Sequence, residues 1–187
     1  MKNKGLEKRL GDEIIEFLNS RKTLNLSSLD EEGYPYASYA PFALGDECIY
    51  VLLSDIAIHG KNLKQNEKAA VQIVEDESEA ATIFARIRVN YQVHASHIEL
   101  DTDEYKAGVE SLFKKHGERI HNLAALSDFN LFRLTPLGGR YVKDFGRAFA
   151  IEGKTLAGES IDRLRDGHKK RADVAVVDRN KEQAKAS

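Results

Sequence analysis

Three strand-like segments follow one another between residues 23 and 53, and no helix-like segment separates them. Thr23 to Leu29 alternates apolar and polar residues, and residues 30–35 have the composition of a turn in which Gly33 can adopt a positive φ. Tyr36 to Ala40 and Cys48 to Leu53 continue as strands. Parallel neighbours need a long crossover connection, so these short connections indicate antiparallel pairing.

The rest of the chain predicts further strands and three helices. Apolar residues at helical spacing predict helices over 6–18, 56–65 and 101–116, with Gly117 as a C-cap. Apolar or alternating runs predict strands over 69–74, 84–95, 130–134, 140–145 and 149–151. We expect residues 135–139 to form a turn between two of these strands and acidic residues 75–79 to form a solvated loop. Such a succession favours an α+β, mainly β fold, with an antiparallel sheet closed as a small barrel and helices around it.

Composition excludes several classes of protein. The chain has 28 Lys and Arg against 30 Asp and Glu, a net charge of −2, which lacks the footprint of a general nucleic-acid binder. No G-x-G-x-x-G opens a helix after a strand, so dinucleotide binding by that route is unsupported. Cys48 is the only cysteine, the N-terminus has no secretory signal, and no run is long and apolar enough to span a membrane. These features predict a cytoplasmic protein without membrane insertion.

Among the six histidines, His168 has the most distinctive surroundings. Residues 161–171 contain five Lys or Arg and two Asp, a net charge of +3, and Gly167 precedes the histidine. Such a segment suits a planar, anionic ligand, but it is more often a solvated basic chain end. None of the histidines has the spacing of a zinc site.

Two other groups of polar residues are candidates for binding. Ser54, His59, Lys61 and Asn62 lie at a strand-to-helix junction, where they could donate to a phosphate or carboxylate, or simply be a helix start with exposed polar side chains. Arg86 and Arg88 are two residues apart on one predicted strand, so they share a face that is either solvated or lines a polar cleft.

Several strings resemble the HutZ/HugZ family of haem-utilisation proteins, within the flavin-binding split-barrel superfamily typified by pyridoxamine 5′-phosphate oxidase. The matching strings are RKTLNLSSLDEEGYPYASYAPF (21–42), LLSDIAIHGKNL (52–63), IVEDESEA (73–80), FARIRV (84–89), LSDFNLFRLTP (126–136), YVKDFGRAF (141–149) and DGHKK (166–170). The early strings are shared across the superfamily, and the last two are more specific to the haem-binding members.

The resemblance implies a homodimer of six-stranded split barrels with ligand clefts at the subunit interface. It implies that His168 is the axial ligand of haem iron and that Asp128 hydrogen-bonds the other ring nitrogen across the dimer, which fixes the tautomer and raises the basicity of the imidazole. Arg88 would lie on the distal side of the haem. The implied division of the chain is an N-terminal helix (1–20), a split-barrel domain (21–151), a ligand-binding segment (152–171) and a tail (172–187).

The implied activity is oxidative opening of haem, with an external electron donor and a haem-delivery protein as partners. Two alternatives remain at this point. One is an FMN-dependent oxidoreductase that uses Ser54, His59, Lys61 and Asn62 near the phosphate, and the other is a haem carrier or storage protein without turnover.

Overall fold

The computed structural model describes residues 4–164. Within that range it contains five helices: α1 (Lys4–Ser20), α2 (Ile58–Gln65), the 3-10 helix η1 (Ile83–Ala85), α3 (Asp103–His116) and α4 (Arg119–Ala124). The strands are β1 (Thr23–Leu29), β2 (Pro35–Pro41), β3 (Ala43–Leu44), β4 (Ile49–Ser54), β5 (Lys68–Val74), β6 (Arg88–Ile98), β7 (Phe129–Asp144), β8 (Arg147–Glu152) and β9 (Ser160–Arg163). None of the described helices is long and apolar enough to cross a membrane.

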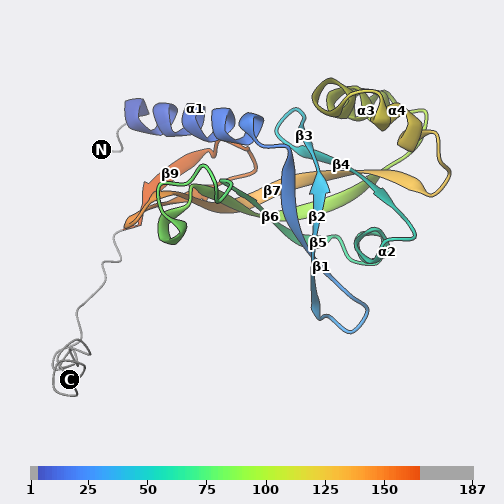
Figure 1. Cartoon of the computed structure of the whole chain (residues 1–187), viewed down its shortest axis with the longest axis horizontal. Helices are drawn as coiled ribbons and strands as arrows, with labels where there is room; N and C mark the ends of the chain where they lie inside the picture. Colours follow the sequence, from blue (N-terminus) through green and yellow to red (C-terminus); the bar gives the residue numbers. More distant parts are fainter. Residues whose placement is uncertain (1–3, 165–187) are drawn as a thin grey trace, which may run out of the picture.

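All strand pairs within residues 4–164 are antiparallel and belong to one sheet, which confirms the predicted α+β, mainly β fold class, although the sheet has more than the six strands expected. The order is β2-β1-β5-β6-β7-β4-β3, with β8 paired to β7 and β9 to β8, so the sheet has nine strands (Figure 1). Within residues 4–164 no ladder joins the two ends of this order, and the sheet is therefore not closed by hydrogen bonds. The predicted closure into a small barrel is therefore wrong for the hydrogen-bonded sheet. Ala40 of β2 and Phe42, just after it, nevertheless share a buried core with Ile49 and Val51 of β4.

β7 is one strand of 16 residues, and the predicted turn at 135–139 is wrong. In the ladder with β6, Gln92 pairs with Gly138 and Val93 with Pro136, so Leu137 is an extra residue. This is a β-bulge, which bends a strand without reversing it. Gly139 then approaches β6 so closely that a Cβ there would lie 2.1 Å from the Asn90 carbonyl oxygen. The glycines that resembled a turn thus serve a bulge and a close backbone contact.

The predicted strand over 84–95 begins too early. Its first residues form η1, where Phe84 is 81% exposed, and the strand starts at Arg88. From there the alternation holds, since Val89, Tyr91 and Val93 are buried. The short elements β3, α4 and β9 were not predicted, because two to six residues show too little periodicity.

Two cores lie on opposite faces of the β4–β7 pair. The larger one fills the inside of the sheet and is covered by α1 through Leu10, Ile14 and Leu18. The smaller one joins β4 to α3 and includes Tyr50 and Leu112. Because β4 is packed on both faces, five of its six residues are buried, which explains its continuous apolar sequence.

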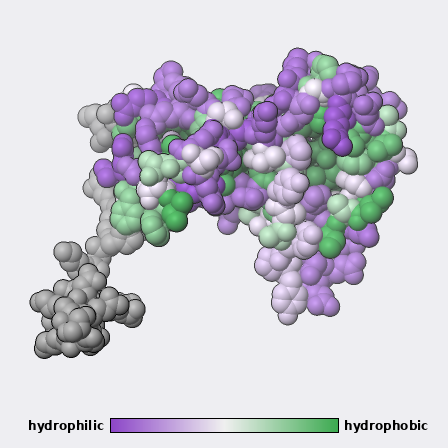
Figure 2. All heavy atoms as spheres, in the orientation of Figure 1, coloured by the Kyte–Doolittle hydropathy of each residue, from purple (hydrophilic) through white to green (hydrophobic). Residues whose placement is uncertain are grey.

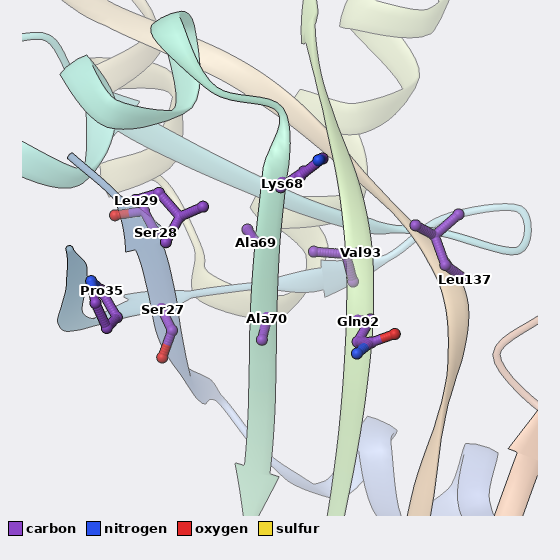
Figure 3. Close-up of a pocket in the computed structure, with 10 residues that line it drawn as sticks. All are labelled: Ser27, Ser28, Leu29, Pro35, Lys68, Ala69, Ala70, Gln92, Val93 and Leu137. Atoms are coloured by element: carbon purple, nitrogen blue, oxygen red, sulfur yellow. The ribbon is translucent and has the colours of Figure 1, made fainter. Parts of the chain in front are cut away.

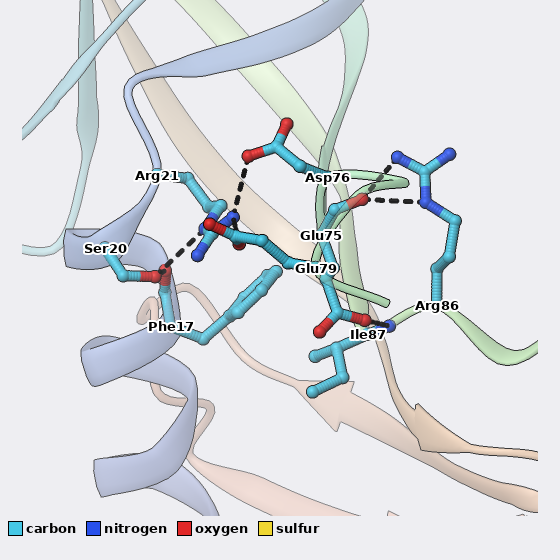
Figure 4. Close-up of polar contacts among 8 residues, drawn as sticks. All are labelled: Phe17, Ser20, Arg21, Glu75, Asp76, Glu79, Arg86 and Ile87. Carbon is cyan, nitrogen blue, oxygen red and sulfur yellow. Dashed lines mark hydrogen bonds and ion pairs between the residues drawn. The ribbon is translucent and has the colours of Figure 1, made fainter. Parts of the chain in front are cut away.

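The acidic loop after β5 contacts the end of α1 (Figure 4). Most of it is exposed, as predicted, but Arg21 ties it to the helix. Nη1 of Arg21 lies 3.0 Å from Asp76 and 2.6 Å from Glu79, and the guanidinium stands over the Phe17 ring. This contact fixes the loop that leads into η1 and β6.

Candidate functional site

Asp128 lies at the end of the β4–β7 ladder, next to Ser54. The register pairs Ser54 with Phe129, which brings the serine beside the residue that precedes β7. The Ser54 hydroxyl donates to Oδ2 of Asp128 at 2.6 Å and accepts from the backbone N–H of Ile56. Oδ1 of Asp128 has no donor among residues 4–164. Ser54 therefore holds Asp128 in place and leaves one carboxylate oxygen available to accept a further hydrogen bond.

A polar network surrounds this pair. Asn130 donates to the Asp128 carbonyl oxygen and to Oδ1 of Asp55, and its Oδ1 lies 3.0 Å from Nε2 of His97. The hydrogen bond from Lys64 at 2.7 Å lowers the pKa of Asp55, and Asn130 adds to this. Sequence analysis did not connect these residues, because they come from β4, α2, β6 and β7.

The predicted donors of α2 are largely used inside the protein. Asn62 is buried and donates to the hydroxyl of Ser28 at 3.0 Å. Nδ1 of His59 lies 3.0 Å from Oγ of Ser38, and burial lowers the pKa of His59 below its usual 6.5, which favours the neutral ring. Lys61 is exposed and has no hydrogen-bond partner in the described part of the chain. Of the four residues expected near a phosphate, Ser54, His59 and Asn62 therefore have partners within the described part of the protein, and Lys61 has none there.

Arg86 and Arg88 do not share a strand face, which corrects the sequence prediction. Arg86 precedes β6 and donates from Nε to the Glu75 carbonyl oxygen at 2.7 Å and from Nη1 to Glu77 at 3.1 Å. Arg88 is the first residue of β6, is half-buried, and donates to the Arg86 carbonyl oxygen. The first arginine is committed to holding the loop, and the second faces a cavity.

That cavity, called here the Arg88 pocket, has a volume of about 520 Å³. Its walls come from η1, β6, β7, β8 and the residue after β9: Phe84, Ala85, Arg88, Arg140, Val142, Asp144, Phe145, Gly146, Ala148 and Leu164. It thus combines exposed aromatic side chains with two guanidiniums, and its volume is in the usual range for small-molecule sites. None of these pocket residues except Arg88 was singled out from the sequence.

Arg88 and Asp128 lie at opposite ends of the β6–β7 ladder. Arg88 pairs with Val142 near the end of β7, whereas Ile98 pairs with Leu131 near its beginning. Ten residues of extended chain separate these pairs, roughly 33 Å at 3.3 Å per residue. Figure 1 shows the same separation, with β7 running from the α3 and α4 end to the β9 end. A single copy of the chain does not bring the two residues together.

An apolar groove lies on another part of the sheet surface (Figure 3). Its volume is about 470 Å³, and it crosses β1, β5 and β6 along small residues such as Ala69 and Ala70. Lys68 is the only charged side chain in its lining. The lining contains no His, Cys, Asp or Glu side chain that could ligate a metal ion, and it has one cation where the Arg88 pocket has two.

His168 lies outside the described residues, so its predicted role as an iron ligand remains a prediction. Among residues 4–164 no group of three or more His, Cys, Asp or Glu side chains could hold a metal ion.

A family model described as pyridoxamine 5′-phosphate oxidase matches residues 10–143. The chain belongs to the pyridoxamine 5′-phosphate oxidase family. Within this family it is 40% identical to a Vibrio cholerae protein named heme oxygenase HutZ, over 91% of this chain and 96% of that protein. The resemblance to the HutZ/HugZ proteins of the family is thus confirmed.

Solved structures with a similar fold agree with this assignment. The crystal structure of HutZ from Vibrio cholerae, described as a heme storage protein, is 42% identical with a TM-score of 0.65, and covers 68% of this chain and 89% of that chain. Campylobacter jejuni ChuZ is 31% identical with a TM-score of 0.72, and the match covers 89% of this chain and 69% of that chain. A heme binding protein from Mycobacterium smegmatis is 26% identical with a TM-score of 0.72, and the match covers 79% of this chain and 60% of that chain.

Proposed function

We propose that this protein binds haem and degrades it oxidatively, as a haem oxygenase-like enzyme that releases iron. The observation that carries the proposal is the 40% identity to heme oxygenase HutZ over nearly the whole of both chains. The Arg88 pocket is consistent with it, because aromatic side chains and guanidiniums together suit a flat, apolar molecule with anionic groups. Haem would be both the substrate and the source of the redox-active iron.

The residues of this chain would bind and orient the haem. The His168 imidazole would ligate the iron through one ring nitrogen, and its other N–H would donate to Oδ1 of Asp128. Ser54 supports this role by holding the second carboxylate oxygen at 2.6 Å. Arg88 would supply N–H donors on the opposite side of the haem, where oxygen or peroxide reacts.

The proposed site needs two copies of the chain. Leu164, the last described residue, lines the Arg88 pocket, and four extended residues reach at most about 14 Å, so His168 of the same chain can approach Arg88. Asp128 lies at the far end of the same ladder and can join that site only from a partner subunit. We therefore propose a homodimer with two shared sites.

The setting of the proposed enzyme is the cytoplasm. Cys48 is buried and has no second cysteine with which to form an intramolecular disulfide, which suits a reducing compartment. An external reductant would supply electrons, and a haem-delivery protein would supply the substrate.

Two other functions have specific support. The match to the pyridoxamine 5′-phosphate oxidase model favours FMN binding, although Asn62 and His59 already use their polar groups internally. The description of HutZ as a heme storage protein favours binding without turnover. Spectra and kinetics separate these functions from haem degradation.

Hemin titration of the purified protein tests the proposal. We expect a sharp Soret band on binding, followed by bleaching when ascorbate is added under air. A stable band would contradict degradation and favour storage, whereas a yellow protein that ignores hemin would favour the flavin function.

Variants test the individual roles. His168→Ala should remove the spectrum of the histidine-ligated iron, whereas His121→Ala on the exposed side of α4 should keep it. Asp128→Asn should keep haem binding but change the rate of bleaching and its pH profile, because the amide is a weaker partner for the imidazole N–H. Unchanged kinetics in Asp128→Asn would contradict its proposed role.

A further inference from the structure

Arg88 and Arg140 project from the same face of the sheet. Arg88 pairs with Val142 and Asn90 pairs with Arg140, so the two arginines are diagonal neighbours on adjacent strands. The alternate residues Val89 and Tyr141 are buried in the main core, so the arginines point away from it. Both line the Arg88 pocket.

These two guanidiniums have no carboxylate partner among residues 4–164. In contrast, Arg21, Arg86 and Arg133 each bind a carboxylate within 3.1 Å. Asp144 is the one carboxylate in the pocket lining, and its Oδ1 accepts from the backbone N–H of Phe145. The pocket therefore carries a net positive charge and has donors available for an anionic ligand.

Two exposed aromatic side chains stand in the same lining. Phe84 is 81% exposed and Phe145 is 66% exposed, and Val142, Ala148 and Leu164 add further apolar surface. Figure 2 shows hydrophobic side chains gathered over this end of the molecule, near the loop that contains η1. A ligand that fits these walls has an apolar, flat body and acidic groups at its edge.

The two arginines differ in their exposure to solvent and in how many of their N–H donors are already used. Arg88 is half-buried, and its Nη1 donates to the Arg86 carbonyl oxygen at 3.0 Å, which holds it inside the pocket. Arg140 is exposed and makes no side-chain hydrogen bond within the described range, so all of its donors are available at the rim. Charged carboxylates favour the rim because they keep part of their hydration there.

We propose that Arg140 binds a propionate carboxylate of haem in the Arg88 pocket and so determines how the haem is oriented. The proposal rests on the proposed function and names a residue for it. A bidentate guanidinium–carboxylate contact at the rim would fix the rotation of the macrocycle, and Arg88 would remain available near its centre.

Two ligands that differ only in their carboxylates test this proposal. Hemin and hemin dimethyl ester are titrated against the full chain by absorbance, and the ratio of their dissociation constants is measured. Arg140→Gln should weaken hemin binding by about fivefold to tenfold and leave the affinity for the ester nearly unchanged. Arg140→Lys should recover part of the loss, because it restores the charge without the planar fork.

Arg119→Gln is the matched control, since Arg119 is an exposed arginine at the start of α4 and lies outside the pocket. It should bind both ligands as the unmodified chain does. The proposal is wrong if Arg140→Gln binds hemin like this control, or if it loses hemin and the ester by the same factor. Failure of the unmodified chain to bind hemin would instead contradict the proposed function itself.

Discussion

His59 shows how the fold changes the chemistry of a single residue. The sequence places it among possible phosphate donors, but its ring is half-buried and contacts Ser38. Burial lowers its pKa, so the ring tends to be neutral in the folded chain. A neutral imidazole is a poor partner for a phosphate dianion, and this weakens the case for FMN at α2.

The lowered pKa predicts a pH dependence of stability. Below pH 6.5 the unfolded chain protonates His59 before the folded chain does, so the free energy of unfolding should fall as the pH decreases below that value. His59→Gln should make this decrease shallower in urea unfolding measured at pH 7.5 and 5.5. Ser38→Ala, which keeps the histidine, should lower stability at both pH values and keep the slope of the unmodified chain. Equal slopes for His59→Gln and the unmodified chain would contradict the prediction.

Asp128 shows that a residue distant in the sequence can hold a side chain in place. Its neighbours in sequence do not show what holds it, because Ser54 is 74 positions away and reaches it through the β4–β7 register. Ser54 was expected to bind a cofactor, and its hydroxyl donates to Asp128, the side chain expected to contact the iron ligand. In the proposed site Ser54 would therefore position Asp128.

At the scale of elements, Arg21 directly after α1 connects this helix to the acidic loop. Arg21 is only 18% exposed in its side chain and binds two carboxylates from a loop 55 and 58 positions away. Such a contact restrains the loop that leads to Phe84 and Arg88. Exposed helical pairs such as Lys8 with Asp12 lack this long-range connection.

This difference predicts unequal effects of two similar substitutions. Arg21→Gln should lower the free energy of unfolding by about 1 kcal/mol, because two charge-assisted hydrogen bonds are lost at a partly buried site. The effect should shrink in 1 M salt, which screens the ion pairs. Lys8→Gln should cause no measurable change in the free energy of unfolding. Denaturant unfolding of the three proteins measures this, and equal stabilities would show that the contact between α1 and the loop contributes little.

At the scale of the whole molecule, the position of the proposed site residues favours a shared site. Arg88 and Asp128 lie at opposite ends of one ladder, separated by roughly 33 Å of extended chain, which is far beyond the reach of a side chain. Hydrophobic side chains are also exposed close in sequence to Ser54, the partner of Asp128: Ile56 is 79% exposed and Ile58, the first residue of α2, is 50% exposed. Exposed apolar side chains of this kind are common at subunit contacts.

Mixed dimers test the shared site directly. Arg88→Gln and Asp128→Asn are co-expressed with different tags, and the heterodimer is purified by two affinity steps. If each site combines Arg88 of one subunit with Asp128 of the other, one site of the heterodimer is intact and the other carries both changes. The heterodimer should then degrade haem at about half the rate of the unmodified dimer. A rate no higher than that of the two single variants would place both residues in one subunit's site and contradict the proposal.

Much of this protein could be inferred from its sequence. The alternation in Thr23 to Leu29, the spacing of Leu10, Ile14 and Leu18 and the glycine after His116 predicted strands and helices that the structure contains, because burial on one face leaves a local pattern. The family strings led to the same fold class and to the HutZ relationship. These features depend on neighbours along the chain.

Other features depend on contacts between distant segments, and no local pattern carries them. Residues 135–139 resemble a turn, yet pairing with β6 keeps them in a strand with a bulge at Leu137. Asn62 resembles a surface donor, yet packing buries it against Ser28. The Arg88 pocket joins η1, β6, β7 and β8, and its distance from Asp128 follows from the length of a shared ladder. The local sequence pattern predicts which helices and strands form, because it depends on neighbouring residues. Only the packing of these elements decides which distant side chains come together and which are held apart.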